Sequence, residues 1–196
     1  MRFYLHDNGS HAVAGGEPGI FQQAMQDMMA WAEKGIAPPP STSYMIKNGQ
    51  VVPPDDAAER HGLQPVMNFT ANGVERATVG VNQPVDLASR IEMPPATGLI
   101  VQYGWTITDL ASVPPPGQGG RGGGALPGSG IAATTANPMT DVDKPQTLVN
   151  VNRKITFDKP GTYVVRLAVK GQRDGLLAPA NQTLLQNYKE VRVVVQ

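Results

Sequence analysis

Cysteine is absent from the 196 residues of the chain. Its absence excludes a disulfide framework, thiolate zinc sites and a cysteine nucleophile. Charged residues make up only 16% of the chain and the formal net charge is zero. Because no basic block or stripe occurs, the chain lacks the electrostatic signature of a protein that binds nucleic acid or an acidic membrane surface. We therefore expect no nucleic-acid partner.

Long apolar runs are also missing, and no run reaches the length that spans a bilayer. Residues 1–7 become polar within six positions and do not fit a signal peptide. If the protein is exported, we expect its signal to lie upstream or on a partner. The chain also lacks the Gly-x-Ser-x-Gly elbow that carries the serine nucleophile of many hydrolases.

Glycine and proline are abundant, with 22 and 18 residues, and they are clustered. The clusters lie at 38–40, 53–54 and 114–130 and mark connections, because such segments cannot hold a helix or a central strand. The glycine run 119–124 has no Gly-Lys-Ser/Thr ending and is no phosphate loop. We expect no cofactor.

One segment, about residues 20–34, has the periodicity of a helix with one buried face. Gly35 is a natural helix stop, and Pro38 forbids continuation. The helix either packs on the β-rich part of the chain or belongs against a sheet missing from this sequence, and we favour the second. Its apolar positions are Phe21, Ala24, Met25, Met28, Met29, Trp31 and Ala32.

From Val66 onward the apolar period changes to two, which predicts half-buried strands separated by turns. About seven short strands without a helix predict a mainly β fold, an antiparallel sandwich. The clearest segments are 67–71, 74–79, 85–87, 101–108, 149–157, 163–170 and 191–195.

These patterns divide the chain into residues 1–37, a linker at 38–65 and a sandwich at 66–196. The first part holds a short strand at 2–5, a turn-rich loop and the helix. In the linker we expect an extended stretch near 44–46, a turn at Asn48-Gly49 and one helical turn within 55–61. The sandwich carries a Gly/Pro-rich insertion at 111–144. We favour a solvated insertion there, with an oligomer contact or a flap over a neighbouring active site as alternatives.

The sandwich resembles PKD domains and related immunoglobulin-like modules. The resemblance rests on residues 79–87, on Tyr103-Gly104-Trp105-Thr106-Ile107 and on residues 157–169, which contain Pro160-Gly161-Thr162-Tyr163. It implies that Trp105 fills the core and that the Pro-Gly-Thr-Tyr turn starts the strand packed on it. Residues 106–109 depart from the Phe-Gly-Asp-Gly turn common in PKD domains, so PKD-like is the fitting description.

Residues 1–37 resemble the last strand, histidine loop and last helix of an α/β-hydrolase, especially of the tannase and feruloyl esterase group. The resemblance rests on Arg2-Phe3-Tyr4-Leu5, on Asn8-Gly9-Ser10-His11 and on residues 29–38. It implies that His11 is the triad histidine and His6 a lesser candidate. The alternative is that His11 has no catalytic role and is a loop histidine hydrogen-bonded to the backbone. Ala12 stands where the tannase group commonly has a cysteine, which favours the broader hydrolase family.

Two functional hypotheses follow. In the first, the chain is the C-terminal portion of an exported, secreted or periplasmic α/β-hydrolase of esterase type with a PKD-like accessory domain. It is not catalytic alone, and missing upstream sequence or a second chain supplies the serine that His11 serves. In the second, it is a non-catalytic extracellular binding or assembly module, and a homo-oligomer is one form that such a module takes. We expect His61 at the surface, and Asp109, Asp141 and Asp143 as solvated turn carboxylates, not calcium ligands.

Overall fold

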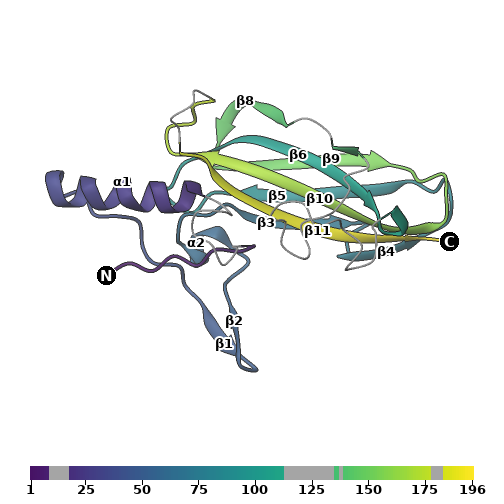
Figure 1. Cartoon of the computed structure of the whole chain (residues 1–196), viewed down its shortest axis with the longest axis horizontal. Coiled ribbons are helices and arrows are strands. Elements are labelled where there is room, and N and C mark those ends of the chain that lie inside the picture. Colours follow the sequence, from purple (N-terminus) through teal and green to yellow (C-terminus); the bar gives the residue numbers. More distant parts are fainter. Residues whose placement is uncertain (9–17, 113–134, 137–138, 178–182) are drawn as a thin grey trace, which may run out of the picture.

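The computed structural model describes residues 1–8, 18–112, 135–136, 139–177 and 183–196. Within these ranges the chain is mainly β, and most strands lie side by side in an elongated body (Figure 1). The N-terminal elements gather at one end of this body, away from the C-terminus. The expected mainly β, antiparallel sandwich is confirmed.

Two sheets make up the sandwich in the described ranges. In the larger sheet the strand order is β4-β11-β10-β6-β7, with β8 also pairing with β6, and in the smaller it is β3-β5-β9. All of these pairs are antiparallel except β4 with β11. The strands are β3 (Val66–Ala71), β4 (Arg76–Val79), β5 (Val85–Glu92), β6 (Leu99–Asp109), β7 (Thr135–Ala136), β8 (Thr140–Gln146), β9 (Leu148–Ile155), β10 (Gly161–Gln172) and β11 (Leu185–Val195).

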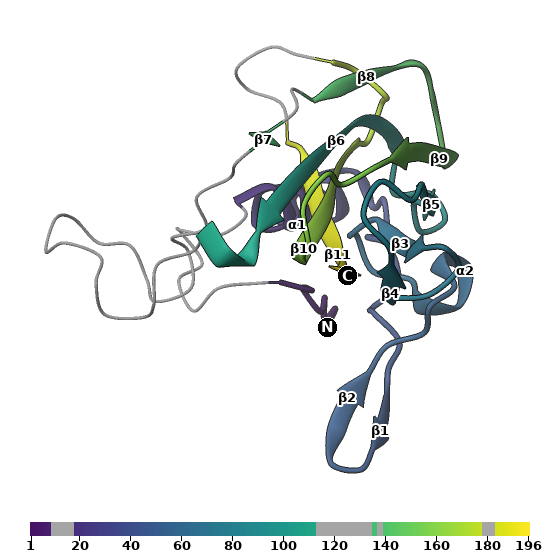
Figure 2. The ribbon, with the colours of Figure 1, turned by 90° about the vertical axis from the view of Figure 1, so that its right-hand side faces the viewer.

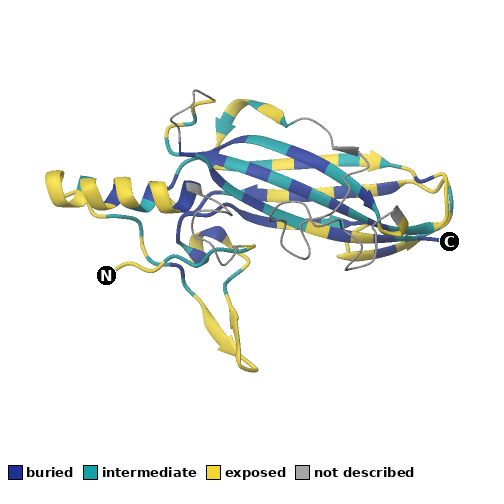
Figure 3. Cartoon of the chain, in the orientation of Figure 1, coloured by how far each residue is buried: buried dark blue, intermediate teal, exposed yellow. Residues whose placement is uncertain are grey.

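This strand order is immunoglobulin-like. Strands β3, β5 and β9 correspond to the A-B-E sheet of that fold, and β6, β10 and β11 to its C-F-G sheet. The alternation along the strands forms the core between the two sheets, since β5 and β10 each place about every second side chain in the interior. Figure 3 shows the resulting bands of buried residues along both sheets.

Trp105 and Phe69 join the two sheets at the centre of the core. Their ring centroids lie 5.5 Å apart in an edge-to-face arrangement, and both side chains are buried. Tyr163 stacks on Phe157 with centroids 4.2 Å apart, and its hydroxyl donates to the Lys159 carbonyl oxygen at 3.1 Å. Trp105 and the Pro-Gly-Thr-Tyr turn therefore lie where the PKD resemblance implied.

The elements before the sandwich are one long helix, α1 (Pro18–Lys34), a hairpin of β1 (Met45–Lys47) and β2 (Gln50–Val52), and a short helix, α2 (Ala57–Arg60). The helix near 20–34 and the turn at Asn48-Gly49 are confirmed. Asp56 caps α2, its carboxylate accepting from the amides of Ala58 and Glu59. The segment 38–65, expected as a linker, thus carries its own elements, and the boundaries between the three parts remain predictions.

Two expectations are wrong. Residues 2–5 form no strand, because the amides of Phe3 and Leu5 donate to the hydroxyl oxygens of Ser41 and Thr42, at 3.0 and 3.1 Å, instead of to a backbone ladder. The range predicted for the aperiodic insertion, 111–144, extends too far at its C-terminal end, because β8 begins at Thr140 and pairs with β6. All seven residues of β8 are exposed or half-buried, so no alternation of buried and exposed side chains reveals this strand in the sequence.

Candidate functional site

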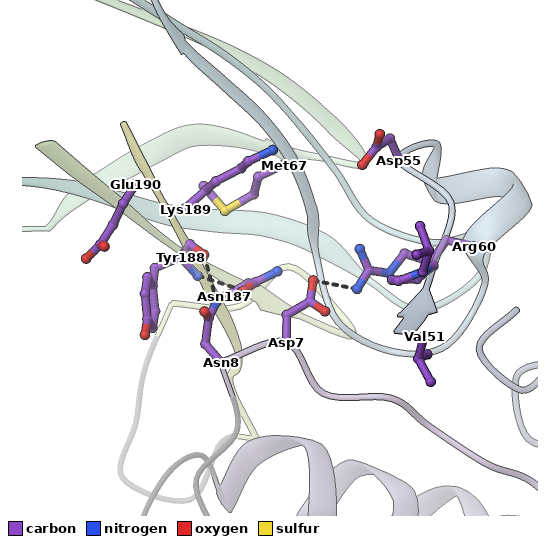
Figure 4. A pocket seen from close by; sticks show the side chains of 12 residues that line it. Asp7, Asn8, Val51, Asp55, Arg60, Met67, Asn187, Tyr188, Lys189 and Glu190 are labelled. Atoms are coloured by element: carbon purple, nitrogen blue, oxygen red, sulfur yellow. Dashed lines mark hydrogen bonds and ion pairs between the residues drawn. The ribbon is translucent and has the colours of Figure 1, made fainter. Parts of the chain in front are cut away.

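A cleft of about 480 Å³ lies where the N-terminal segment, α2 and β11 meet (Figure 4). Charged, amide and apolar side chains all contribute to its walls. They come from Asp7, Asn8, Val51, Val52, Pro53, Asp55, Arg60, Met67, Asn187, Tyr188, Lys189 and Glu190.

Side-chain amides cover the β11 edge at this cleft. The Asn8 amide donates to the Tyr188 carbonyl oxygen at 2.8 Å and to Oδ1 of Asn187 at 3.1 Å. The Gln64 amide donates to the Gln186 carbonyl oxygen at 2.9 Å. The Asn187 amide in turn donates to the Pro65 carbonyl oxygen at 2.7 Å. An open strand edge invites pairing with another chain, so these amides close the edge at the positions they reach.

An ion pair fastens the N-terminal segment to the same cleft. The Arg60 guanidinium donates to the Asp7 carboxylate, and the Arg60 side chain is only 9% exposed. Gln64 brackets the Asp7 backbone, accepting from its amide at 2.9 Å and donating to its carbonyl oxygen at 3.1 Å. Removing Asp7 would leave a buried cation without its partner, which is costly. The polar groups of Asp7, Arg60 and Gln64 at the cleft therefore stabilise the position of the N-terminal segment.

The one predicted catalytic residue, His11, lies outside the described residues, so its role stays a prediction. Asn8, the last described residue before it, lines the cleft (Figure 4). His6 is half-buried in the N-terminal segment. His61 is half-buried, not a fully surface residue, and its amide donates to the Ala57 carbonyl oxygen where α2 ends.

Two of the three carboxylates considered for calcium accept hydrogen bonds from the chain. Asp109 accepts from the amide of Ala111 at 2.9 Å, and Asp141 accepts from the side-chain amide of Gln102 at 2.7 Å. Across the described residues, no group of three or more His, Cys, Asp or Glu side chains could hold a metal ion. None of the helices there combines the length and hydropathy needed to cross a bilayer.

Helix α1 meets the sandwich through a largely polar side. One Arg173 nitrogen, Nη2, lies 3.0 and 2.9 Å from the two carboxylate oxygens of Asp27. The Gln23 amide donates to the same carboxylate at 3.0 Å. Gln23, Asp27 and Ile20 are buried, and Ala24 packs against the core. This buried polar cluster sets the rotation of α1 about its own axis.

Tyr4 lies near this cluster. Burial raises the pKa of its hydroxyl above the ordinary value of 10.0, and the Asp27 carboxylate adds to the rise. The hydroxyl donates to the Pro39 carbonyl oxygen at 3.0 Å. The N-terminal segment, α1 and the chain after it are therefore tied together at this end of the sandwich.

The outward side of α1 is apolar. Helices of globular proteins normally turn their apolar side to the core. In α1, polar side chains instead face the sandwich. Five large apolar side chains of the helix are each between 40% and 55% exposed, and Figure 3 shows most of α1 as exposed, with its buried residues at the end next to the sandwich. They are Phe21, Met25, Met28, Met29 and Trp31, which we call the α1 apolar face.

Of the apolar positions predicted for the helix, only Ala24 packs on the sandwich, where Ile20, Gln23 and Asp27 are buried beside it. Whether the other apolar positions belong against a sheet outside this sequence stays a prediction. Sequence reasoning missed the Asp27–Arg173 pair and the amides of Asn8, Gln64 and Asn187. The partners of each lie far along the chain, and no local pattern marks them.

Comparisons with known proteins assign no family to this chain. No family model matches the chain, and no curated protein matches it. Among solved structures, one that it resembles is the CARDB domain of a Pyrococcus furiosus protein, crystallised in complex with di-metal ions. The TM-score is 0.37 and the identity 14%, and the match covers 67% of this chain and 92% of that one. The fold assignment therefore rests on the strand order described above.

Proposed function

We propose that this chain is a non-catalytic accessory module that docks to a partner domain through the α1 apolar face. The observation that carries the proposal is the rotation of α1. Gln23 and Asp27 are buried against the sandwich, whereas Phe21, Met25, Met28 and Met29 lie on the outward side and Trp31 is half exposed near the end of the helix. A contiguous exposed apolar patch on a folded protein usually marks an interaction surface.

The partner we propose is the catalytic portion of an exported, esterase-type α/β-hydrolase, either upstream in the same polypeptide or on a second chain. The resemblance of residues 1–37 to the end of such a fold supports this choice. In α/β folds both faces of the parallel sheet are covered by helices, each presenting an apolar side to the sheet. The outward direction of the α1 apolar face suits such a contact.

In this proposal His11 takes the proton from a serine supplied by the partner and returns it to the leaving alcohol. The serine forms an acyl intermediate with the substrate ester, which water then cleaves. No triad chemistry is assigned to the chain alone. Secretion or location in the periplasm belongs to the same proposal.

Mass spectrometry of the native protein tests the choice of partner. We expect peptides from upstream sequence, or a co-purifying chain, containing a Gly-x-Ser-x-Gly elbow. The 196-residue chain found alone and monomeric would contradict the proposal.

Substitution of His11 tests its role once the partner is present. In an activated-ester assay, His11→Ala should lower kcat at least about a thousandfold, because triad members act as a unit. His61→Ala, at the end of α2, is the control and should leave kcat unchanged. An unchanged kcat in the His11 variant would remove this residue from catalysis.

Substitutions on α1 test the docking surface itself. Phe21→Gln combined with Met28→Gln should weaken binding to the catalytic portion at least tenfold, measured by calorimetry. Both side chains are half exposed, so the fold should survive. The matched control is Gln22→Ala with Gln26→Ala, two exposed polar positions on the same helix. Equal affinity in both double variants would contradict docking through this face.

The second candidate function is a self-assembling module, in which the α1 apolar faces of two copies pack on each other. The same outward apolar face favours it, because two-fold packing of identical patches is the commonest route to a homodimer. Sedimentation velocity distinguishes the two. A concentration-dependent dimer that Phe21→Gln with Met28→Gln abolishes would favour self-assembly over the hydrolase partner.

A further inference from the structure

The sequence contains three Asn-Gly pairs, at residues 8–9, 48–49 and 72–73. An asparagine before glycine is able to react with its own backbone, because glycine carries no side chain to shield the nitrogen that follows. The first pair extends outside the described residues, but its Asn8 amide donates to the Tyr188 carbonyl oxygen and to Oδ1 of Asn187. The other two pairs form turns that the structure describes completely, so their environments are directly comparable.

Asn48-Gly49 and Asn72-Gly73 form nearly identical turns. Each is a two-residue loop in which both φ values are positive, 52° and 75° in the first and 50° and 81° in the second. Such a pair of values is typical of the tight hairpin turn whose twist matches that of its flanking strands. All four residues are exposed, and both glycines have open space where a side chain would stand. Dipeptide, turn and exposure are therefore the same at the two sites.

The Asn72-Gly73 turn is held firmly by the sandwich. The Asn72 backbone amide donates to the Asp86 carbonyl oxygen at 2.8 Å, and its Oδ1 atom accepts from the Asp86 amide at 2.8 Å. Ala71, just before this turn, is fully buried in the core. The turn opens only where β3 separates from β5, and opening within a packed sheet has a high free-energy cost.

The Asn48-Gly49 turn lies instead at the tip of the β1–β2 hairpin, which projects from the body (Figures 1 and 2). Every residue of both strands is exposed, and each strand is only three residues long. A two-stranded hairpin of this kind is marginally stable in water. The Ser43 amide fixes its root by donating to the Arg60 carbonyl oxygen at 2.7 Å. Among the described residues, none holds the Asn48 side chain as Asp86 holds that of Asn72.

We infer that Asn48 is a site of spontaneous modification, where asparagine is converted to isoaspartate and the hairpin opens as a result. The Gly49 nitrogen attacks Cγ of Asn48. A bond forms between these two atoms, the bond from Cγ to Nδ2 breaks, and Nδ2 leaves as ammonia with the proton from the Gly49 nitrogen. The product is a five-membered succinimide ring. The reaction needs no cofactor, oxidant or partner, so it is independent of the proposed function.

The folded turn protects Asn48 from this reaction. Ring closure needs a ψ at the asparagine far from its value in a turn of this type, so the turn must first open. A hairpin forms in about 1–10 µs, which is far faster than the chemical step. The rate of modification therefore follows the population of the open turn. Because the turns at Asn48 and Asn72 are otherwise alike, their rates differ as their open populations differ.

Water then opens the ring at either of its two carbonyl carbons. Attack at Cγ gives aspartate, and Asp-Gly suits the same turn. Attack at the main-chain carbonyl carbon gives isoaspartate, in which the chain runs through Cγ and is longer by one carbon atom. The longer loop no longer fits the register that pairs Ile46 with Val51. Neither product returns to asparagine, so the hairpins that carry isoaspartate stay open.

Peptide mapping of the folded chain after ageing at mildly alkaline pH tests the inference. Mass spectrometry detects the conversion, and chromatography separates isoaspartate from aspartate. We expect both products to accumulate at Asn48 at least about tenfold faster than at Asn72 or Asn8, because the open population sets the rate. Equal rates at Asn48 and Asn72, or fastest conversion at Asn8, would overturn the inference.

The same chain unfolded in urea is the control. There the rates at Asn48 and Asn72 should approach each other, because neither turn is formed. A ratio that stays the same in urea would show that the neighbouring residues, and not the fold, set the difference, and this too would overturn the inference.

Asn48→Gly tests the effect of the modification on the hairpin. Gly-Gly suits the same turn and has no side chain to form the ring. Hydrogen exchange at the amides of residues 45–52 should become faster in the aged parent and stay unchanged in the aged variant. Unchanged exchange in an aged parent that carries isoaspartate, or equal acceleration in the parent and the variant, would overturn the proposed opening of the hairpin.

Discussion

Asp27 of α1 and Arg173, in the turn after β10, form the ion pair that decides which way α1 faces. The Arg173 Nη2 atom reaches both carboxylate oxygens, at 3.0 and 2.9 Å, and the Asp27 side chain is only 9% exposed. A charge this deeply buried must stay paired. The helix therefore keeps its polar side on the sandwich even though this leaves the α1 apolar face in solvent.

Removing the carboxylate should loosen α1. Asp27→Ala leaves Arg173 without its partner, and we expect a local loss of roughly 1–3 kcal/mol. Hydrogen exchange at the α1 amides should become correspondingly faster, while the sheet amides remain protected. Glu33→Ala, exposed near the end of the same helix, is the control. Unchanged exchange in the Asp27 variant would mean that another contact sets the rotation.

The beginning of α1 should tolerate no side chain at Gly19. A Cβ added there would lie 1.8 Å from the Leu184 carbonyl oxygen, a backbone atom that cannot move without β11. Gly19→Ala should therefore displace α1 and cost roughly 1–3 kcal/mol. Urea unfolding followed by tryptophan fluorescence measures this. Gly80→Ala, where the nearest neighbour is the flexible Gln83 side chain at 3.3 Å, should change stability far less.

The edge-to-face pair in the core should dominate the stability of the sandwich. Phe69→Ala removes a fully buried ring from its contact with Trp105, and we expect a loss of about 3–5 kcal/mol in the free energy of unfolding. Val74→Ala, at an exposed position between β3 and β4, should stay within about 0.5 kcal/mol of the parent. A loss below about 1 kcal/mol for Phe69→Ala would contradict the placement of this ring at the centre of the core.

Tyr163 should make stability sensitive to alkaline pH. Burial, and then the charges of Asp109 and Asp158, raise the pKa of its hydroxyl above the ordinary value of 10.0. The unfolded chain therefore loses this proton first as pH rises. The stabilising contribution of Tyr163 is complete below pH 10 and is lost between that pH and the raised pKa of the folded state.

Tyr163→Phe isolates this effect from other titrating groups. The urea midpoints of the parent and the variant should be compared at about pH 8 and about pH 11. We expect the advantage of the parent over the variant to shrink at the higher pH. An advantage that stays constant or grows would show that the hydroxyl ionises no later in the folded chain than in the unfolded one.

Much of the fold could be predicted because its signals are local. Period-two alternation located the sandwich strands, and Asn48-Gly49 located the hairpin turn. Trp105 stood out as a large side chain in an alternating segment, and Tyr163 as one beside the Pro-Gly-Thr turn residues. Each of these patterns reports a preference of a few neighbouring residues for one backbone conformation and one buried side.

The functional surface could be predicted only in part. The periodicity of α1 indicated a helix with an apolar side in need of a partner, and the structure leaves that side exposed. Whether His11 belongs to an active site stays a prediction, because it lies outside the described residues. The amides that close the β11 edge had no sequence signal, since Asn8 and Tyr188 are 180 positions apart.

By itself, the sequence determined most strands of the sandwich, the hairpin turn and the approximate extent of α1, because these depend on residues close together in the chain. Only the tertiary structure decided which side of α1 is buried, where β8 begins and how the β1–β2 hairpin is fastened to the N-terminal segment. Those outcomes depend on contacts such as Asp27 with Arg173, 146 positions apart, and Thr42 with Phe3. The physical reason is that a buried charge or an unpaired backbone group must find its partner wherever the fold places one.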